Sequence, residues 1–265
     1  MAPDGQNFRA VNAIKLLENK KDITLDELIA LGYDHYLAAF DVLLPPLFAA
    51  FNSAPDSLKK LYALPVQKLQ EWDKRTDANS IATTIAIEWG SLMFQALPPA
   101  KTSEEGTYQT ERVINMLKSM SNNRLLDIFT IAINNLTKKY GTWEIKWGEI
   151  NRYQRPGDGV SFNDSAPSVP VSLTSSAFGQ LPSFQSKLMN TKNRYGYSGN
   201  SFIAAVEFGP RIKAKSIITG GQSFDPSSKH FTDQAAGYID GKFKDVLFYK
   251  EDVLGHAEKT YHPGD

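Results

Sequence analysis

The residues most able to carry chemistry lie in the last third of the chain. Gly221-Gln-Ser-Phe-Asp225 is close to the G-x-S-x-G pattern of a nucleophile elbow, a sharp strand-to-helix turn that exposes a serine hydroxyl. Asp225 stands where this turn needs its second glycine. Without the turn nothing activates the Ser223 hydroxyl, so we predict that Ser223 is not the nucleophile of a serine hydrolase.

His230 and Asp233 are three residues apart, a spacing that places two metal ligands on one face of a helix. Such pairs are common, and no third ligand lies nearby in the sequence. The sequence spacing of the other histidines, His35, His256 and His262, pairs none of them with a second metal ligand. We therefore expect no metal site in this chain, and we interpret His230 or Asp233 as a support for the loop before it.

Two aromatic pairs could line a pocket for an acyl or aromatic group: Trp143 with Trp147, and Tyr195 with Tyr197. Aromatic residues at strand spacing belong to the core more often than to a pocket, and we interpret them in that way. The acidic residues of the neighbouring loops have no spacing that pairs them as acid and base; they are Glu149, Asp158 and Asp164.

Composition and charge exclude several classes of protein. The 29 Lys and Arg residues balance the 29 Asp and Glu residues, so no net field favours nucleic acid or an anionic membrane as a partner. The lack of cysteine excludes disulfides, thiol chemistry and Cys-based zinc sites. Asp41, Pro45 and Pro46 interrupt the apolar run Tyr36–Phe51, so no bilayer-spanning segment is predicted. The polar start, Met1–Asn7, lacks the pattern of a signal peptide.

The first helices follow from apolar spacing and a cap. Thr24 and Glu27 form a capping box, which predicts a helix that begins at Leu25. An earlier helix is predicted from Phe8, with one apolar side that we expect to be buried: Ala10, Ala13, Ile14 and Leu17.

Prolines and caps delimit the helices that follow. Pro45-Pro46 is predicted to stop or kink the chain, Pro55 to open a short helix and Pro65 to open another. Asp77–Ser80 offers several N-caps for a helix over Ile81–Met93. The remaining predicted helices cover Glu104–Ser119 and Arg124–Lys139.

Strands and loops are predicted after Gly141, which closes the last of these helices. Trp143, Ile145 and Trp147 alternate with polar residues, the pattern of a strand with one buried face. Residues 151–200 are rich in Pro, Gly, Ser and Asn, which is typical of irregular loops around short strands. The remaining elements are predicted as a hairpin of Ser201–Phe208 with Ala214–Thr219, a helix near Ser228–Ile239, a strand at Phe243–Tyr249 and a helix at Glu251–Thr260. The chain is therefore predicted to be α+β, with a helical region at 1–140 and a strand-and-loop region at 141–265.

A series of motifs resembles the penicillin acylase and acyl-homoserine-lactone acylase family of N-terminal-nucleophile amidohydrolases. Asp225–Gln234 is similar to the family's closing D-P-x-S-x-H-[FY]-x-D-Q pattern, and Trp143 with Trp147-Gly-Glu149 is similar to its W-x-x-x-W-G-[DE] element. The order and spacing of these pieces run through nearly the whole chain. The further segments that carry the resemblance are Trp72-Asp73, Asn200–Phe208, Lys213–Ser216, Gly220–Ser223, Gly241–Val246 and Phe248–Asp252.

The resemblance implies a fold and a chemistry. Members fold as an αββα sandwich and cut themselves to expose an N-terminal Ser, whose own α-amino group acts as the base. An α-amino group titrates near pH 8, which suits a base at neutral pH. This chain would be the C-terminal part of the large subunit, with regions 1–140 and 141–265 belonging to one larger acylase domain. Such relatives are usually exported, which implies a periplasmic or secreted location for the full-length protein.

One position of the implied active site is found in this chain. Arg9 begins the segment Arg9–Leu17, which is similar to the family's R-x-x-x-I-x-x-L-L helix although its Ile falls one place late. The resemblance implies that Arg9 steadies the surroundings of the nucleophile or polarises the substrate; the alternative is a surface arginine at a helix start. Ser121-Asn-Asn123 resembles the start of the large subunit in many such acylases, but its helical flanks favour a cap between two helices.

The resemblance also implies partners that the chain lacks. The nucleophile, the oxyanion Asn, the small subunit and the calcium-binding carboxylates would all lie outside it, so calcium is implied only for the complete enzyme and no cofactor for this chain. Our first hypothesis is the C-terminal segment of an amidohydrolase for penicillin-type amides, N-acyl-homoserine lactones or related acyl amides, inactive alone. The second is a non-catalytic binding or scaffold protein derived from such an acylase. An independent enzyme built on Ser223 and His230 has the least support.

Overall fold

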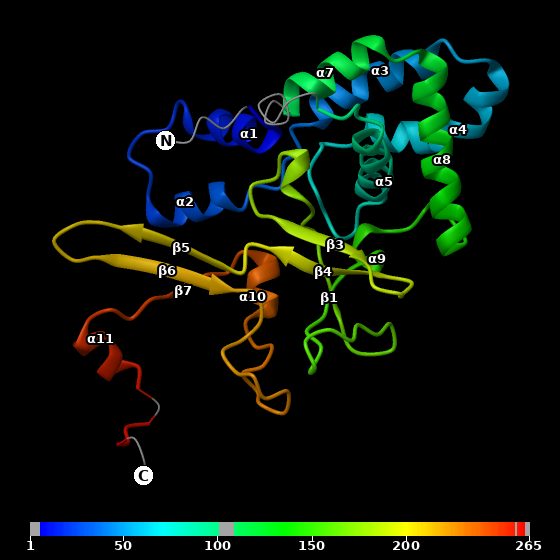
Figure 1. The fold of residues 1–265 in the computed structure, drawn as a ribbon. Coiled ribbons are helices and arrows are strands. Elements are labelled where there is room, and N and C mark those ends of the chain that lie inside the picture. Colours follow the sequence, from blue (N-terminus) through cyan, green and yellow to red (C-terminus); the bar gives the residue numbers. More distant parts are fainter. Residues whose placement is uncertain (1–5, 101–108, 258, 263–265) are drawn as a thin grey trace. The chain divides into compact units, whose positions relative to one another are not determined.

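The protein is described by a computed structural model that covers residues 6–100, 109–257 and 259–262 (Figure 1). The chain forms two compact units. The first unit comprises Met1–Lys21 and Gly32–Asn200, and the second comprises Asp22–Leu31 and Ser201–Asp265. The change from helices to strands falls after Tyr140, inside the first unit. The assignment of regions 1–140 and 141–265 to one larger acylase domain stays a prediction.

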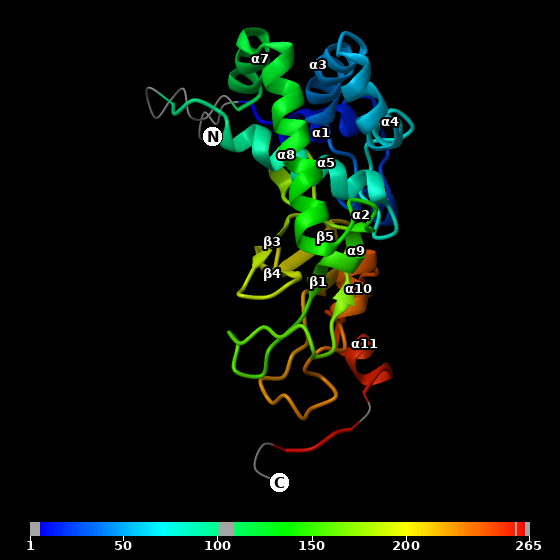
Figure 2. The same cartoon turned by 90° about the vertical axis from the view of Figure 1, so that its right-hand side faces the viewer.

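A buried helix forms the centre of the first unit. Helix α5, Ile81–Gln95, is buried on nearly all sides, including Trp89 and Met93, as expected of a helix whose apolar residues are not confined to one stripe. Helix α8 packs against both α3 and α5 (Figure 2). The helices around α5 in this unit are α1 (Phe8–Leu17), α3 (Phe40–Asn52), α4 (Asp56–Gln70), α7 (Gln109–Ser119) and α8 (Asn122–Tyr140). Within the described ranges, no helix is long and apolar enough to cross a membrane.

The predicted caps of α5 and α8 are confirmed. Ser80 Oγ accepts a hydrogen bond from the Thr83 N–H, and Ser121 Oγ accepts one from the Arg124 N–H. Gly141 ends α8 with a φ of 85°, a left-handed conformation that favours glycine. Ser121-Asn-Asn123 is therefore a helix start, as predicted. Helix α7 confirms the described part of the helix predicted from Glu104, whose first residues lie outside the described ranges.

Pro45-Pro46 and Pro65 lie inside helices and do not delimit them, so the predicted stop at Pro45-Pro46 is wrong; the alternative, a kink there, stays a prediction. Helix α3 continues through Pro45 and Pro46, and α4 continues through Pro65, which was predicted to open a separate helix. Proline removes one backbone donor and crowds the preceding turn. The buried apolar faces of these helices outweigh that cost, since Leu44 and Leu47 beside the proline pair are at most 1% exposed. The helix predicted at Pro55 is confirmed, with Pro55 as its N-cap.

The strand predicted from Trp143 to Trp147 is wrong. A one-turn helix, α9 (Trp147–Ile150), forms instead. The Trp147 N–H donates to Ser80 O and the Gly148 N–H to Ala78 O, so these donors bind the loop before α5 and are not available to a strand partner. Gly148 also packs against that loop, where a Cβ would lie 2.8 Å from the Ala78 Cβ.

A four-stranded sheet completes the first unit. Its strand order is β2-β1-β4-β3, with β1 parallel to β4 and the other neighbours antiparallel. This confirms the prediction of short strands among loops between residues 151 and 200. The strands are β1 (Asn151–Tyr153), β2 (Val169–Pro170), β3 (Phe184–Leu188) and β4 (Arg194–Gly199), with a 3-10 turn, η1 (Ser176–Phe178), between β2 and β3.

The second unit contains the predicted hairpin. Strands β5 (Phe202–Glu207) and β6 (Lys213–Ile218) pair antiparallel, and β7 (Lys244–Asp245) pairs with the other edge of β6. Helix α2 (Leu25–Gly32) begins at Leu25 as predicted, and the Glu27 N–H donates to Thr24 Oγ1. Asp26 of this helix forms an ion pair with Lys215 of β6.

Three elements of the second unit are shorter than predicted. The helix expected from Ser228 begins only at Ala235 (α10, Ala235–Asp240), because the Asp225 side chain accepts the N–H and hydroxyl of Ser227 and holds the chain in a turn. The strand expected at Phe243–Tyr249 is reduced to β7, and the last helix is α11, Lys250–Gly255.

Candidate functional site

Ser223 and His230 lie in one loop of the second unit but do not form a nucleophile and base. Ser223 Oγ accepts a hydrogen bond from the Asp225 N–H at 3.1 Å, and the His230 ring bonds to the Asp233 carboxylate at 2.7 Å. Within the described part of the chain, no hydrogen bond joins Ser223 Oγ to the His230 ring. His230 and Asp233 also press against Gly221, where a Cβ would lie 2.0 Å from the His230 carbonyl oxygen. These contacts support the interpretation of the pair as a support for the loop.

Arg9 lies near the start of α1 and is exposed. Asn7 caps this helix through the Ala10 N–H at 2.9 Å. The Arg9 Nε donates to Leu181 O at 2.9 Å. A guanidinium carries five N–H donors, and this bond uses one of them. Arg9 is thus fixed through its Nε, and its remaining N–H groups can donate to a carbonyl or a carboxylate.

The buried side of α1 differs from the prediction. Phe8 and Asn12 are buried, whereas Ile14 is 58% exposed and Leu17 is 43% exposed. Phe8 stacks on Phe94 with ring centroids 6.5 Å apart. The side of α1 that faces the core of the first unit carries Phe8 and Asn12. The predicted apolar side, with Ile14 and Leu17, is therefore not buried.

Asn12 connects α1 to two loops of the first unit. Its Nδ2 donates to Gly179 O at 3.1 Å, to Asp34 Oδ1 at 3.2 Å and to Tyr36 O at 3.4 Å. Arg75 Nη1 forms an ion pair with Asp34 Oδ2 at 2.6 Å. The amide therefore fixes the position of the helix that carries Arg9.

The ionisable groups around the Asn12 amide have hydrogen-bond or ion-pair partners. Burial would raise the pKa of Asp34, but the hydrogen bonds from Arg75, Asn12 and the Tyr36 N–H outweigh it and hold the pKa below its usual value. The Tyr36 hydroxyl donates to Asp41, and burial together with this bond raises the pKa of Tyr36. Both groups keep their ordinary charge at neutral pH, which fits a structural network.

A pocket of about 440 Å³ lies beside the start of α1. Phe94, Leu97 and Val113 form apolar wall, and Arg112 is fixed by a 2.7 Å hydrogen bond from Nη2 to Pro98 O. Apolar walls with a few polar groups suit an acyl or aromatic body. The other residues that line this pocket are Asn7, Pro98, Pro99 and Gln109.

Of the aromatic residues that could have lined a pocket, Trp147 and Tyr195 belong to the core, whereas Tyr197 is 49% exposed, so its interpretation as a core residue is wrong. Trp147 is 2% exposed, and its indole N–H points to Leu173 O at 3.5 Å. Tyr195 is fully buried and its ring stacks on Phe162. Asp164 accepts the Tyr195 hydroxyl and two backbone N–H groups, so it holds a loop. Glu149 and Asp158 are exposed. Within the described ranges no group of three potential metal ligands occurs.

Comparison with known proteins assigns the chain to a family. The family model described as penicillin amidase matches residues 2–255. The chain therefore belongs to the penicillin amidase family, which confirms the resemblance. Among solved structures, it is similar to the thermostable penicillin G acylase from Alcaligenes faecalis in its orthorhombic form, with a TM-score of 0.54 and 13% sequence identity. This likeness confirms the predicted fold class, a helical first half followed by strands and loops of an N-terminal-nucleophile hydrolase.

The match covers 99% of this chain and 52% of that acylase chain, so this chain spans about half the length of the acylase that it matches. The role of Arg9 stays a prediction. The sequence analysis did not name Asn12 or its partners Asp34 and Arg75, which hold the helix of Arg9. One signal was present: Asn12 lies four residues after Phe8, on the same face of a helix.

Proposed function

We propose that this chain is the C-terminal segment of an amidohydrolase that cleaves acyl amides with an N-terminal serine located outside these 265 residues. The substrates proposed are penicillin-type amides, N-acyl-homoserine lactones or related acyl amides. The observation that carries the proposal is the match to the penicillin amidase family along residues 2–255. The nucleophile attacks the amide carbonyl and the α-amino group of the same serine takes its proton.

An exposed apolar face in the second unit supports the proposal. On one side of strand β5 and its end lie Phe202, Ala204, Val206 and Phe208, all of them exposed. Phe202 is 63% exposed and Phe208 is 83% exposed. The opposite side of the hairpin carries the buried Ala205 and Ile217. An apolar sheet face that is left exposed marks an interaction surface, and we propose that the rest of the acylase covers this one.

In this proposal Arg9 has a supporting role in catalysis. Its helix is held by Asn12, and its guanidinium, bonded once to Leu181 O, can steady the surroundings of the nucleophile or donate to the substrate. The pocket beside the start of α1, with Phe94 and Val113, would contribute to the wall that receives the acyl group.

The partners proposed are the small subunit, the N-terminal part of the large subunit and a small acyl amide. Nucleic acid and membrane are not proposed as partners. The described residues gather no set of ligands that would fit calcium, so any calcium site is proposed to lie in the rest of the enzyme. A periplasmic or secreted location is proposed for the full-length protein.

The experiment is to isolate the gene product from its source, measure its mass and sequence the coding region upstream of Met1. A larger precursor with an in-frame Gly-Ser junction followed by Asn-Asn is expected. The chain is then assayed alone and co-expressed with the upstream polypeptide, with release of the free amine from a penicillin-type amide and an N-acyl-homoserine lactone as the readout. Turnover is expected only for the co-expressed protein.

Matched variants separate the roles of single residues. In the co-expressed protein, Arg9→Ala is expected to lower kcat/KM at least tenfold, with partial recovery in Arg9→Lys. Arg124→Ala, an exposed arginine at the start of α8, is the control and should retain full activity. Turnover by the chain alone that disappears in Ser223→Ala would overturn the proposal. A stable 29.5 kDa gene product without turnover would instead favour a non-catalytic binding or scaffold protein.

A further inference from the structure

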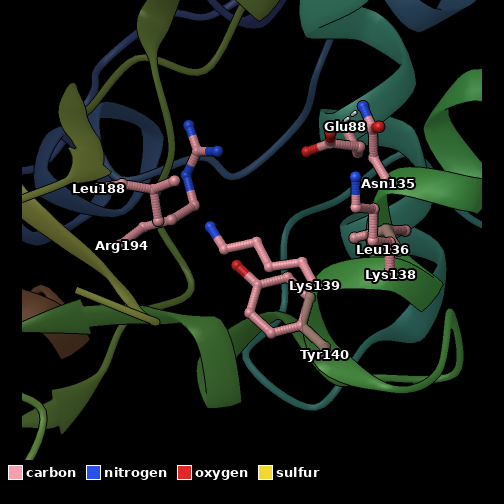
Figure 3. A pocket seen from close by; sticks show the side chains of 8 residues that line it. All are labelled: Glu88, Asn135, Leu136, Lys138, Lys139, Tyr140, Leu188 and Arg194. Atoms are coloured by element: carbon pink, nitrogen blue, oxygen red, sulfur yellow. Dashed lines mark hydrogen bonds between the residues drawn. The ribbon is translucent and has the colours of Figure 1, made fainter. Parts of the chain in front are cut away.

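A second pocket of the first unit, of about 420 Å³, combines basic and apolar residues. Lys138, Lys139 and Tyr140 enter it from the C-terminal end of α8, and Arg194 enters it from the start of β4 (Figure 3). Figure 3 shows Lys139 and Tyr140 pointing toward the Arg194 side chain. The remaining residues that line it are Glu88, Asn135, Leu136 and Leu188. We call this the α8–β4 pocket.

The positive charge of the α8–β4 pocket is not neutralised by the protein. The pocket has three cations and one carboxylate, Glu88. Glu88 Oε1 accepts the Asn135 amide at 3.4 Å. Among the residues that the structure describes, no carboxylate lies within ion-pairing distance of Lys138, Lys139 or Arg194. Like charges gathered without a counterion are expected to attract an anion.

Arg194 has donors that the fold does not use. Its Nη2 donates to Ser186 O at 3.2 Å, but its buried Nε has no acceptor in the described part of the chain. A guanidinium held by one bond, with others unmet, is suited to a carboxylate or phosphate oxygen.

The pKa values of Lys139 and Tyr140 agree with a pocket that carries excess positive charge. Burial and the nearby Arg194 lower the pKa of Lys139, with partial compensation from Glu88 and Asp164. Asp164 itself is occupied by the backbone N–H groups of Lys192 and Asn193. Burial raises the pKa of Tyr140 to about 12, so its hydroxyl stays a donor at neutral pH.

We infer that the α8–β4 pocket binds a small organic carboxylate with an apolar body. The carboxylate would accept from Arg194 and Lys139, and the apolar body would lie against Leu136, Leu188 and the Tyr140 ring. A pocket of this volume suits an organic molecule better than a lone inorganic anion. None of these residues belongs to the site proposed around Arg9, so binding here does not depend on the proposed catalysis.

The test is calorimetric titration of the 265-residue chain with hexanoate, acetate and hexanamide. Hexanoate is expected to saturate one site below about 10 mM, with weaker binding as salt is added. Acetate lacks the apolar body and hexanamide lacks the charge, so both should bind at least tenfold more weakly. Equal affinity for hexanoate and hexanamide, or no saturation by hexanoate, would overturn the inference. Equal affinity for hexanoate and acetate would overturn the role of the apolar wall.

Variants locate the site. Arg194→Gln and Lys139→Met are each expected to weaken hexanoate binding at least tenfold, and the second variant keeps the test valid if the first does not fold. Lys68→Met is the control, since Lys68, like Lys139, is a lysine in the last turn of a helix but does not line the pocket. If the lysines of α8 only complement the helix dipole, all three variants will bind hexanoate as the wild type does, and the inference fails.

Discussion

Replacement of Asn12 by alanine tests how strongly one buried amide holds the helix that carries Arg9. The amide has two N–H donors, and its nearest acceptors are Gly179 O at 3.1 Å and Asp34 Oδ1 at 3.2 Å. In Asn12→Ala the buried Gly179 carbonyl loses a donor, which costs about 1–3 kcal/mol. Asp34 loses one of several donors, which costs about 1 kcal/mol because Arg75 and Tyr36 remain bonded to it.

The expected loss in the free energy of unfolding is therefore about 2–4 kcal/mol. For an m value of about 2 kcal/mol/M, the urea midpoint should fall by roughly 1–2 M. All 4 tryptophans of the chain belong to the first unit, so tryptophan fluorescence follows the unfolding of that unit. Asn134→Ala, at an exposed position of α8, is the control and should be neutral or slightly stabilised, because alanine favours helix. A loss below about 1 kcal/mol in Asn12→Ala would refute the reasoning.

The same variant should change the dependence of stability on pH. The pKa of Asp34 is held below its usual value of 3.8 in the folded state, so its contribution is present above that pH and is lost as the pH falls through the folded pKa. Loss of the Asn12 amide moves the pKa of Asp34 upward and reduces this contribution. The stability difference between wild type and Asn12→Ala should thus be larger at pH 7 than below pH 3.8, and a constant difference would contradict this.

Gly90→Ala should lower the unfolding free energy by about 1–2 kcal/mol despite the better helix propensity of alanine, because a Cβ there would lie 2.8 Å from the buried Phe178 ring. Gly32→Ala, with nothing within 4 Å of its Cβ, is the urea-unfolding control and should change stability by less than about 1 kcal/mol. Ser121→Ala removes the cap of α8 and should cost about 1 kcal/mol in the same assay, and an unchanged midpoint would show that the cap has no weight. Burial raises the pKa of Tyr140 from 10.0 to about 12. The neutral hydroxyl therefore contributes its full stabilisation of the folded state below pH 10.0, and this contribution is lost as the pH rises toward 12. Wild type should therefore lose more stability than Tyr140→Phe between pH 10.0 and about 12. In phenolate absorbance, the variant should show one group fewer that ionises near pH 12. Identical pH profiles for the two proteins would contradict the burial of this hydroxyl.

Features that depend on a few neighbouring residues were predictable from the sequence. The caps at Ser80 and Ser121 and the glycine end of α8 are local, because a side chain or a left-handed turn satisfies groups at most four residues away. The β5–β6 hairpin is local for the same reason, since a short turn sets its register.

Features decided by packing were mispredicted. Pro45-Pro46 do not stop α3, and Pro65 lies inside α4 instead of opening a separate helix, because the buried faces of α3 and α4 outweigh the lost hydrogen bonds. Trp147 alternates like a strand residue but begins a helix, because its N–H binds the loop before α5. A hydrogen bond from a backbone N–H to a segment distant in the chain cannot be predicted from the spacing of apolar residues around that N–H.

The sequence by itself determined the family, the fold class and the position of Arg9 at the start of a helix. The tertiary structure decided what holds that helix, through Asn12, and brought Arg194 to the lysines at the end of α8. These groups are far apart in the chain, and their meeting depends on how the helices and the sheet of the first unit pack together. A spacing pattern reports neighbours within a few residues, whereas a buried amide or a cluster of like charges depends on every segment that surrounds it.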